Sequence, residues 1–211
     1  MEKLDRIHQG RRSPNESFMS DSELLPVTIG DFWAWSSSDV ISNVTRGVLA
    51  EYIVGLALDV PEIKNGIREE WAAFDLCDPR GIDIEVKSAA YTQSWTQKDY
   101  SKITFKYPAT QNWDADTNAV SNEKSRPAQV YVFALLAHKE QETLNPLDVS
   151  QWEFYVVPTV VLDRRKRSQS SITLKSLRDL HGDPLSFGKL KEAVGEAARF
   201  HNALLKSEGF E

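Results

Sequence analysis

Two acidic residues and a lysine occupy neighbouring segments that a fold could bring together. Asp75 lies in a short apolar and aromatic run, and Glu85 and Lys87 follow it, two residues apart. Mg²⁺ prefers oxygen ligands and typically takes one or two carboxylates together with phosphate oxygens of a substrate. A lysine can position an attacking water or stabilise developing negative charge. These residue types favour metal-dependent hydrolysis of a phosphodiester.

The elements that must position these residues are two strands. Residues 82–90 alternate between apolar and polar, which predicts a strand with Glu85 and Lys87 on the same face. The run 71–76 predicts another strand, on which Asp75 points away from its apolar neighbours. A turn containing proline and glycine separates the runs, so they are expected to form a hairpin. Asp75 would then lie beside Glu85.

Two further groups could join this site. Apolar residues at helical spacing predict a helix over 38–58, and Glu51 lies inside it. Glu51 could contact a metal through water or hold the site from behind its ligands. The backbone carbonyl of Val86, between the acid and the lysine, could add a metal-binding oxygen.

The pattern Glu51, Asp75, Glu85-x-Lys87 resembles the PD-(D/E)XK nuclease superfamily. In that superfamily an acidic residue on a helix precedes an Asp on one strand and an acidic-x-Lys motif on the next. The sequence departs from the pattern before Asp75, where Phe74 replaces a frequent proline. The order of elements resembles the family over about residues 40–165.

The resemblance implies an α/β protein with the restriction-endonuclease-like fold, a mixed central sheet flanked by helices. It implies an endonuclease or phosphodiesterase that uses Mg²⁺, for which Mn²⁺ may substitute, to cleave nucleic acid, with DNA as the expected substrate. Gln93 resembles a glutamine seen in some branches. The implied metal ligands are Asp75, Glu85 and Val86. The implied catalytic set is Asp75, Glu85, Lys87, Glu51 and Gln93.

The rest of the chain predicts an arm followed by one domain. Residues 1–25 are polar and irregular and are expected to form a flexible N-terminal arm, with a single domain over 26–211. Asp31 is expected to cap a helix. The remaining expected elements are a polar excursion over 91–126 with a strand near 103–105, buried strands over 130–137 and 152–161, and helices over 174–180 and 187–205.

Composition restricts the class of protein. The net charge is −6, so nucleic-acid binding through bulk charge is disfavoured and a local basic patch such as 164–167 would be needed. The single cysteine, Cys77, permits no intrachain disulfide, which fits a cytoplasmic setting. We expect no membrane span and no secretory signal. The histidines are widely scattered, which argues against a histidine-based metal site. A homodimer is left open.

Other interpretations compete with a nuclease site. The same residues could form a cross-strand row of surface salt bridges, with Asp75 and Glu85 exposed and apart. A catalytically idle nuclease-fold module for nucleic-acid binding or protein assembly is another alternative. Asp83 is expected to be a solvated rim residue. Trp95 and Trp113 could stack on bases, whereas the core is expected to contain Trp33, Trp35, Trp71 and Trp152.

Overall fold

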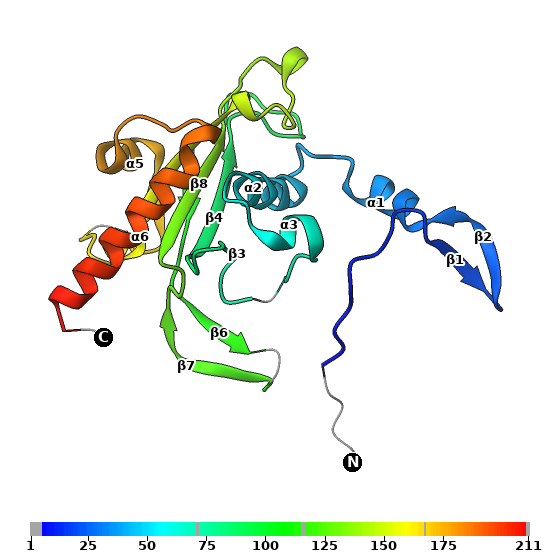
Figure 1. Ribbon diagram of the computed structural model, residues 1–211. Coiled ribbons are helices and arrows are strands. Elements are labelled where there is room, and N and C mark those ends of the chain that lie inside the picture. Colours follow the sequence, from blue (N-terminus) through cyan, green and yellow to red (C-terminus); the bar gives the residue numbers. More distant parts are fainter. Residues whose placement is uncertain (1–5, 71, 115–116, 167, 210–211) are drawn as a thin grey trace.

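A mixed four-stranded sheet forms the centre of the computed structural model, with helices on both of its faces (Figure 1). Its strands, in spatial order, are β3 (Leu76–Cys77), β4 (Asp83–Ala90), β8 (Val130–Leu136) and β9 (Trp152–Pro158). β4 and β8 run parallel, and the pairs β3–β4 and β8–β9 are antiparallel. The mixed α/β class predicted from the sequence is confirmed. The structure describes residues 6–70, 72–114, 117–166 and 168–209.

β8 forms where the sequence predicts a strand, and β9 forms over the first part of its predicted range. All residues of β8 are buried, as expected for an apolar strand with neighbours on both sides. β9 ends at Pro158, which has no N–H to donate to a sheet ladder. The chain then turns directly into the short helix α4 (Thr159–Asp163), so the predicted strand over 152–161 is correct up to this proline.

Each face of the sheet has its own apolar core. On one face, Ile84 and Val86 of β4 pack with α2 (Asn43–Ala57) and α6 (Leu190–Ser207). On the other face, aromatic residues such as Phe133 pack with α5 (Leu174–His181) and β5 (Thr104–Lys106). α3 (Pro61–Asn65) follows α2, and its Ile63 side chain packs against Gly55 of α2. The prediction that Trp33 and Trp35 belong to the core is wrong, whereas Trp152 is buried as predicted.

Helix α2 begins later than the sequence predicts. Residues 38–42 contain a turn in which the Asp39 carboxylate accepts the N–H groups of Ile41 (3.2 Å) and Ser42 (3.0 Å). Asp side chains bonded to nearby backbone compete with a helical conformation. The helical spacing of the apolar residues extends into this turn, which explains the predicted start at residue 38.

The N-terminal segment is more ordered than predicted. β1 (Ser17–Ser20) and β2 (Glu23–Thr28) pair as a hairpin, and α1 (Ile29–Ser37) follows. The helix near Asp31 is confirmed, but its cap is Thr28; Asp31 completes the capping box by accepting the Thr28 N–H at 2.7 Å. This hairpin and helix project from the body of the protein (Figure 1).

The polar excursion contains more strands than predicted. β5 (Thr104–Lys106) confirms the expected strand near 103–105 and pairs with β10 (Ser171–Thr173). A separate ribbon of β6 (Thr110–Asp114) and β7 (Ala119–Ser125) was not predicted, because its residues are polar and lack alternation.

Among the described residues, no helix is long and apolar enough to cross a membrane. Short 3₁₀ turns lie at Gln141–Thr143, Val149–Gln151 and Phe187–Lys189.

Candidate active site

The hairpin β3–β4 places Asp75 beside Glu85. Leu76 pairs with Ile84, and the Asp75 N–H donates to the Ile84 carbonyl at 3.1 Å. The next position along this antiparallel register sets Asp75 opposite Glu85, and opposite residues share a face. The predicted strand over 71–76 is shorter than expected, since β3 begins only at Leu76. Trp71 lies outside the described residues.

A tight turn connects the segment that carries Asp75 to the strand that carries Glu85. The buried Asp78 carboxylate accepts the N–H groups of Arg80 (2.8 Å) and Ile82 (3.2 Å). Gly81 has a φ of 75°, a left-handed conformation that glycine adopts without strain. The predicted turn is therefore present, and it returns the chain so that β4 runs back past Asp75.

Lys87 completes a cluster of three charged side chains. Its ammonium group forms an ion pair with Glu85, two residues earlier on the same face of β4. The positive charge of Lys87 also acts on Asp75, whose pKa it lowers against the other influences at the site. The structure thus brings Asp75, Glu85 and Lys87 together, in half-buried positions. This geometry differs from the surface row of separated, exposed charges that was the competing interpretation.

The environment of Asp75 favours its neutral form in the metal-free protein. Burial and the neighbouring Glu85 carboxylate raise the pKa of Asp75 from 3.8 to about 7, with Glu51 adding a smaller repulsion. Lys87 and the Val86 N–H act in the opposite direction. The site therefore holds more carboxylate charge than its own cations neutralise, a condition that a bound cation would relieve.

Glu51 approaches Asp75 from α2, on the opposite face of β4. Its carboxylate forms a two-bond ion pair with Arg68, at 2.5 Å to Nε and 3.0 Å to Nη2. Arg68 also interacts electrostatically with Asp75. Sequence reasoning missed Arg68, because it stands in a charged segment without periodicity between α3 and β3.

The Val86 backbone faces the same edge of the sheet as Asp75. Its N–H donates to Asp75 Oδ2 at 2.7 Å, and the N–H and C=O of one strand residue point to the same side. The Val86 carbonyl therefore faces this edge as well. Within the described residues, there is no group of three or more His, Cys, Asp or Glu side chains arranged to hold a metal. A metal here would depend on the Asp75–Glu85 pair, a carbonyl and water.

Gln93 forms its side-chain hydrogen bonds with residues outside the cluster of Asp75, Glu85 and Lys87. Its side-chain amide donates to the Ala90 carbonyl (2.9 Å) and to Ser101 Oγ (3.1 Å), and its Oε1 accepts from Arg46 (3.2 Å). These bonds fix the segment that follows β4. A catalytic role for Gln93 stays a prediction.

Arg46 is a buried cation that connects α2 to this segment. Only 4% of its surface is exposed, and its guanidinium donates to the Ile41 carbonyl (2.8 Å), to Asn43 Oδ1 (2.6 Å) and to Gln93. Burial lowers its pKa. Among the described residues it has no acidic partner, and its Nε has no hydrogen-bond acceptor. Its role is to fix the start of α2 against the chain after β4.

Removal of Arg46 should therefore destabilise the protein. We expect Arg46→Ala to lower the free energy of unfolding by about 2–4 kcal/mol, because a buried side chain is removed and three acceptors in partly buried bonds lose their donor at once. Arg46→Lys should recover only part of the loss, since an ammonium cannot reproduce the planar fork. Arg12→Ala is the control: it removes an exposed ion pair with Glu16, worth less than about 1 kcal/mol. Urea unfolding measures all three, and equal losses for Arg46 and Arg12 would contradict this role.

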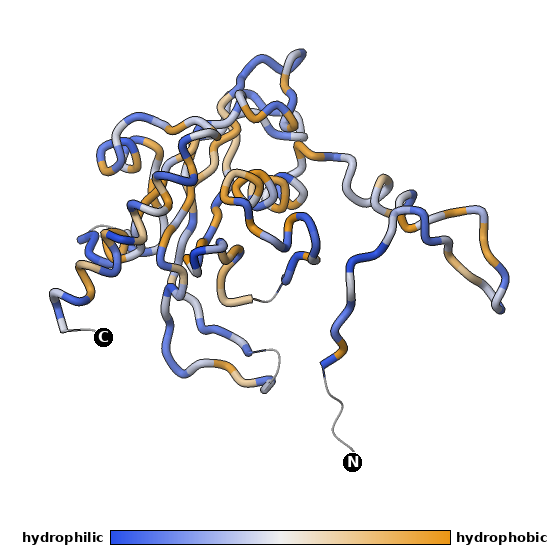
Figure 2. The backbone as a smooth tube through the Cα atoms, in the orientation of Figure 1, coloured by the Kyte–Doolittle hydropathy of each residue, from blue (hydrophilic) through white to orange (hydrophobic). Residues whose placement is uncertain are grey.

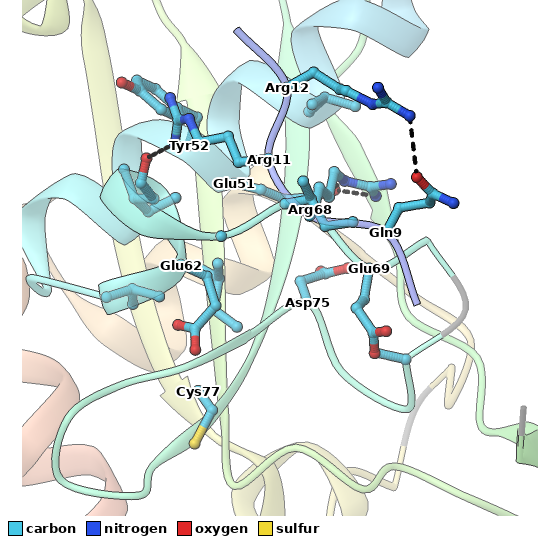
Figure 3. Close-up of a pocket in the computed structure, with 18 of the residues that line it drawn as sticks. Gln9, Arg11, Arg12, Glu51, Tyr52, Glu62, Arg68, Glu69, Asp75 and Cys77 are labelled. Atoms are coloured by element: carbon cyan, nitrogen blue, oxygen red, sulfur yellow. Dashed lines mark hydrogen bonds and ion pairs between the residues drawn. The ribbon is translucent and has the colours of Figure 1, made fainter. Parts of the chain in front are cut away.

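A cavity of about 850 Å³ adjoins the acids. Its walls come from the N-terminal segment, α2 and the chain between α3 and β3, and most of the lining is apolar. Figure 3 shows Glu51, Arg68 and Asp75 at this cavity, with Arg11 and Arg12 contributed by the N-terminal segment. The charged cluster therefore lies beside a large apolar cleft.

The other candidate contacts for nucleic acid are partly engaged within the chain. Arg164 pairs with Glu208, and Arg165 bonds to the Tyr107 hydroxyl. Arg167 of the same basic cluster lies outside the described residues. Trp95 is exposed, as stacking on a base would require. Trp113 donates from Nε1 to Asn118 Oδ1 at 3.1 Å.

The fold and the site define a mixed α/β protein with paired carboxylates and a lysine at the edge of its central sheet. Residues 34–176 match the family model described as bacteriophage T4 endonuclease IV, and the chain belongs to this family. The matched region contains every residue of the candidate site. The family is one of endonucleases, so the protein is an enzyme, a nuclease that acts on nucleic acid. No curated protein and no solved structure matches the chain.

Proposed function

We propose that this protein is a Mg²⁺-dependent endonuclease of the PD-(D/E)XK type that hydrolyses phosphodiester bonds in DNA. The observation that carries the proposal is the meeting of Asp75, Glu85 and Lys87 at the edge of a mixed sheet. Membership of an endonuclease family supports the reaction class. The order of the strands and the helix that bears Glu51 support a restriction-endonuclease-like fold.

The residues present fit a divalent cation. Asp75 and Glu85 would hold it together with the Val86 carbonyl, an all-oxygen donor set of the kind that Mg²⁺ prefers. Burial, together with repulsion from Glu85, raises the pKa of Asp75, and a cation would remove the repulsion. When bound, the ion lowers the pKa of a water and neutralises charge on the transition state.

The chain's own groups have separate tasks in this proposal. The Lys87 ammonium, held by Glu85, can turn to orient a water molecule or donate to a phosphate oxygen as negative charge develops. Arg68 holds the Glu51 carboxylate next to Asp75 and so fixes the orientation of Glu51. Gln93 and Arg46 hold the chain beyond β4, and with it the end of the strand that carries Lys87.

A cleavage panel tests the proposal. Purified protein is incubated with single-stranded, duplex and branched DNA, and with RNA of the same sequences, in EDTA, Mg²⁺, Mn²⁺ or Ca²⁺. We expect internal cleavage of DNA with Mg²⁺ or Mn²⁺ and none in EDTA. Cleavage in EDTA would refute the metal requirement, and preferential cleavage of RNA would refute the substrate class.

An idle module predicts a different outcome. In that case no substrate is cleaved with any metal, and calorimetric titration with Mn²⁺ gives the same affinity for the wild type and for Glu85→Ala. The proposal instead requires weaker Mn²⁺ binding by Glu85→Ala, because that substitution removes a ligand while Asp75 stays in place.

A further inference from the structure

Arg68 acts on two acids of the candidate site. It stands in the charged stretch that follows α3, which Figure 2 shows as hydrophilic chain. Its guanidinium bonds to both oxygens of the Glu51 carboxylate and also interacts electrostatically with Asp75. Figure 3 shows the three residues on the wall of the 850 Å³ cavity. The fold itself therefore holds a cation beside the acids.

The Glu51–Arg68 pair engages the Glu51 carboxylate fully. Only 13% of the Glu51 side chain is exposed, against 37% of the Arg68 side chain. A carboxylate that is bonded by the planar fork of an arginine has both oxygens occupied and its orientation fixed. Glu51 therefore has little capacity to bind a metal ion while Arg68 stays in place.

Two of the three acids at the site have a cation of their own. Lys87 pairs with Glu85, and Arg68 pairs with Glu51. Asp75 is repelled by both of the other carboxylates, and among the described residues it has no ion pair. It accepts only the Val86 N–H. Asp75 is thus the acid that lacks a positive partner.

The charges of this cluster suit one divalent cation. When every group is ionised, the three acids exceed the two cations by one negative charge. One divalent cation turns this into one excess positive charge, which the single negative charge of a phosphodiester neutralises. A second divalent cation would leave two positive charges without a partner in a half-buried site, and such charge is costly to bury.

The geometry agrees with this balance. The ions of a two-metal site lie about 3.5–4 Å apart, so such a pair needs several ligands close together. Within the part of the chain that the structure describes, no three His, Cys, Asp or Glu side chains converge in that way. On the Glu51 side of Asp75, the position of a second ion is close to the Arg68 guanidinium.

We propose that Arg68 takes the place of a second divalent cation, so that the site binds one metal ion. The guanidinium neutralises Glu51 and keeps it from the metal. Asp75, Glu85 and the Val86 carbonyl are left to hold the ion. This inference rests on the proposed function, because it concerns the same metal site. Arg68 is then a positioning residue that sets the number of ions bound.

Calorimetric titration of the full chain with Mn²⁺ at pH 8 tests the proposal. We expect the wild type to bind one Mn²⁺ per chain. Arg68→Met removes the charge and should bind two, because Glu51 becomes free to hold a second ion next to Asp75. The first ion should bind roughly 10-fold more tightly, since a repelling charge several ångströms away is gone. Electron paramagnetic resonance should show an isolated ion in the wild type and mutual broadening in Arg68→Met.

Three variants separate the charge of Arg68 from other effects. Arg68→Lys keeps the charge and should bind one Mn²⁺, as the wild type does. Adding Glu51→Gln to Arg68→Met should return the number to one, because the second ion then lacks its carboxylate. Arg12→Met is the matched control: Arg12 pairs with Glu16 and lines the same cavity, and one Mn²⁺ is expected.

Thermal unfolding in EDTA reports whether each variant is folded. Arg68→Met leaves a mostly buried carboxylate without its partner, which destabilises the protein. Arg68→Gln repeats the test if Arg68→Met does not fold, because the amide still donates to Glu51 but carries no charge. Two Mn²⁺ per chain are expected for this variant as well.

Several outcomes would overturn the inference. These are two Mn²⁺ in the wild type, one Mn²⁺ in every folded neutral variant of Arg68, or two in Arg12→Met. A wild type that binds no Mn²⁺ would refute the proposed metal requirement together with this inference. One bound ion without cleavage of any DNA would leave the inference standing while refuting the proposed function.

Discussion

Lys87→Ala is expected to reduce DNA cleavage at least about 100-fold while leaving the fold intact. Under the proposed mechanism, Lys87 is the cation of the cluster that donates a hydrogen bond to phosphate oxygens as their negative charge increases. Its ion pair with Glu85 is partly exposed to solvent, so the pair contributes little to stability. Single-turnover cleavage with saturating Mg²⁺ measures the chemical step, and thermal unfolding reports the fold.

Two further variants make this result specific. Lys87→Arg should not restore the rate, because the wider guanidinium fork does not occupy the position of an ammonium. Asp83→Asn removes a charge from the same face of β4, away from Asp75, and should retain most of the activity. A Lys87→Ala protein as active as the wild type would exclude the assigned role, and so would an equal loss in Asp83→Asn.

Asp75→Asn is expected to stabilise the metal-free protein at pH 8. The pKa of Asp75 is raised from 3.8 to about 7, so the folded state binds this proton more tightly than the unfolded state does. The stability associated with the protonated carboxyl is fully present below pH 3.8 and is lost as the pH rises through about 7. Ionised Asp75 therefore destabilises the fold at pH 8, and a neutral amide avoids that penalty.

The expected gain is about 2–4 kcal/mol, since each unit of pKa shift corresponds to about 1.4 kcal/mol. In a chain of this size that raises the melting temperature by roughly 4 °C or more. The gain should vanish near pH 4. Asp59→Asn is the control: the exposed Asp59 pairs with Lys191, its pKa is lowered, and no gain is expected. A melting temperature of Asp75→Asn equal to that of the wild type at pH 8 would contradict the raised pKa.

The part of the site that could be predicted from the sequence depends on strict local rules. Alternation over β4 fixes which face carries Glu85 and Lys87, and the turn at Asp78 and Gly81 fixes the return of the chain. Together these rules determine that Asp75 meets Glu85. A continuous apolar run similarly identifies β8, because only a strand with neighbours on both sides is buried along its whole length.

What could not be predicted depends on contacts between distant segments. Arg68 reaches Glu51 from an irregular segment, and no spacing in the sequence joins them. The β1–β2 hairpin turns at Asp21 and Ser22, both with positive φ and neither a glycine, so its turn signal is weak. Trp35 belongs to a helix with an apolar side, yet the chain supplies no surface to cover it.

The hydrogen bond from the Val86 N–H to Asp75 Oδ2 also bears on solubility. β3 is only two residues long, so no backbone carbonyl of β3 accepts the Val86 N–H. The Asp75 side chain accepts it instead. A free donor on the edge of a sheet invites pairing with a strand from another molecule. Asp75→Ala would leave this donor open and favour aggregation, whereas Asp75→Asn keeps an acceptor in place. The carboxylate that we assign to catalysis thus also prevents the sheet edge from pairing with a strand of another molecule.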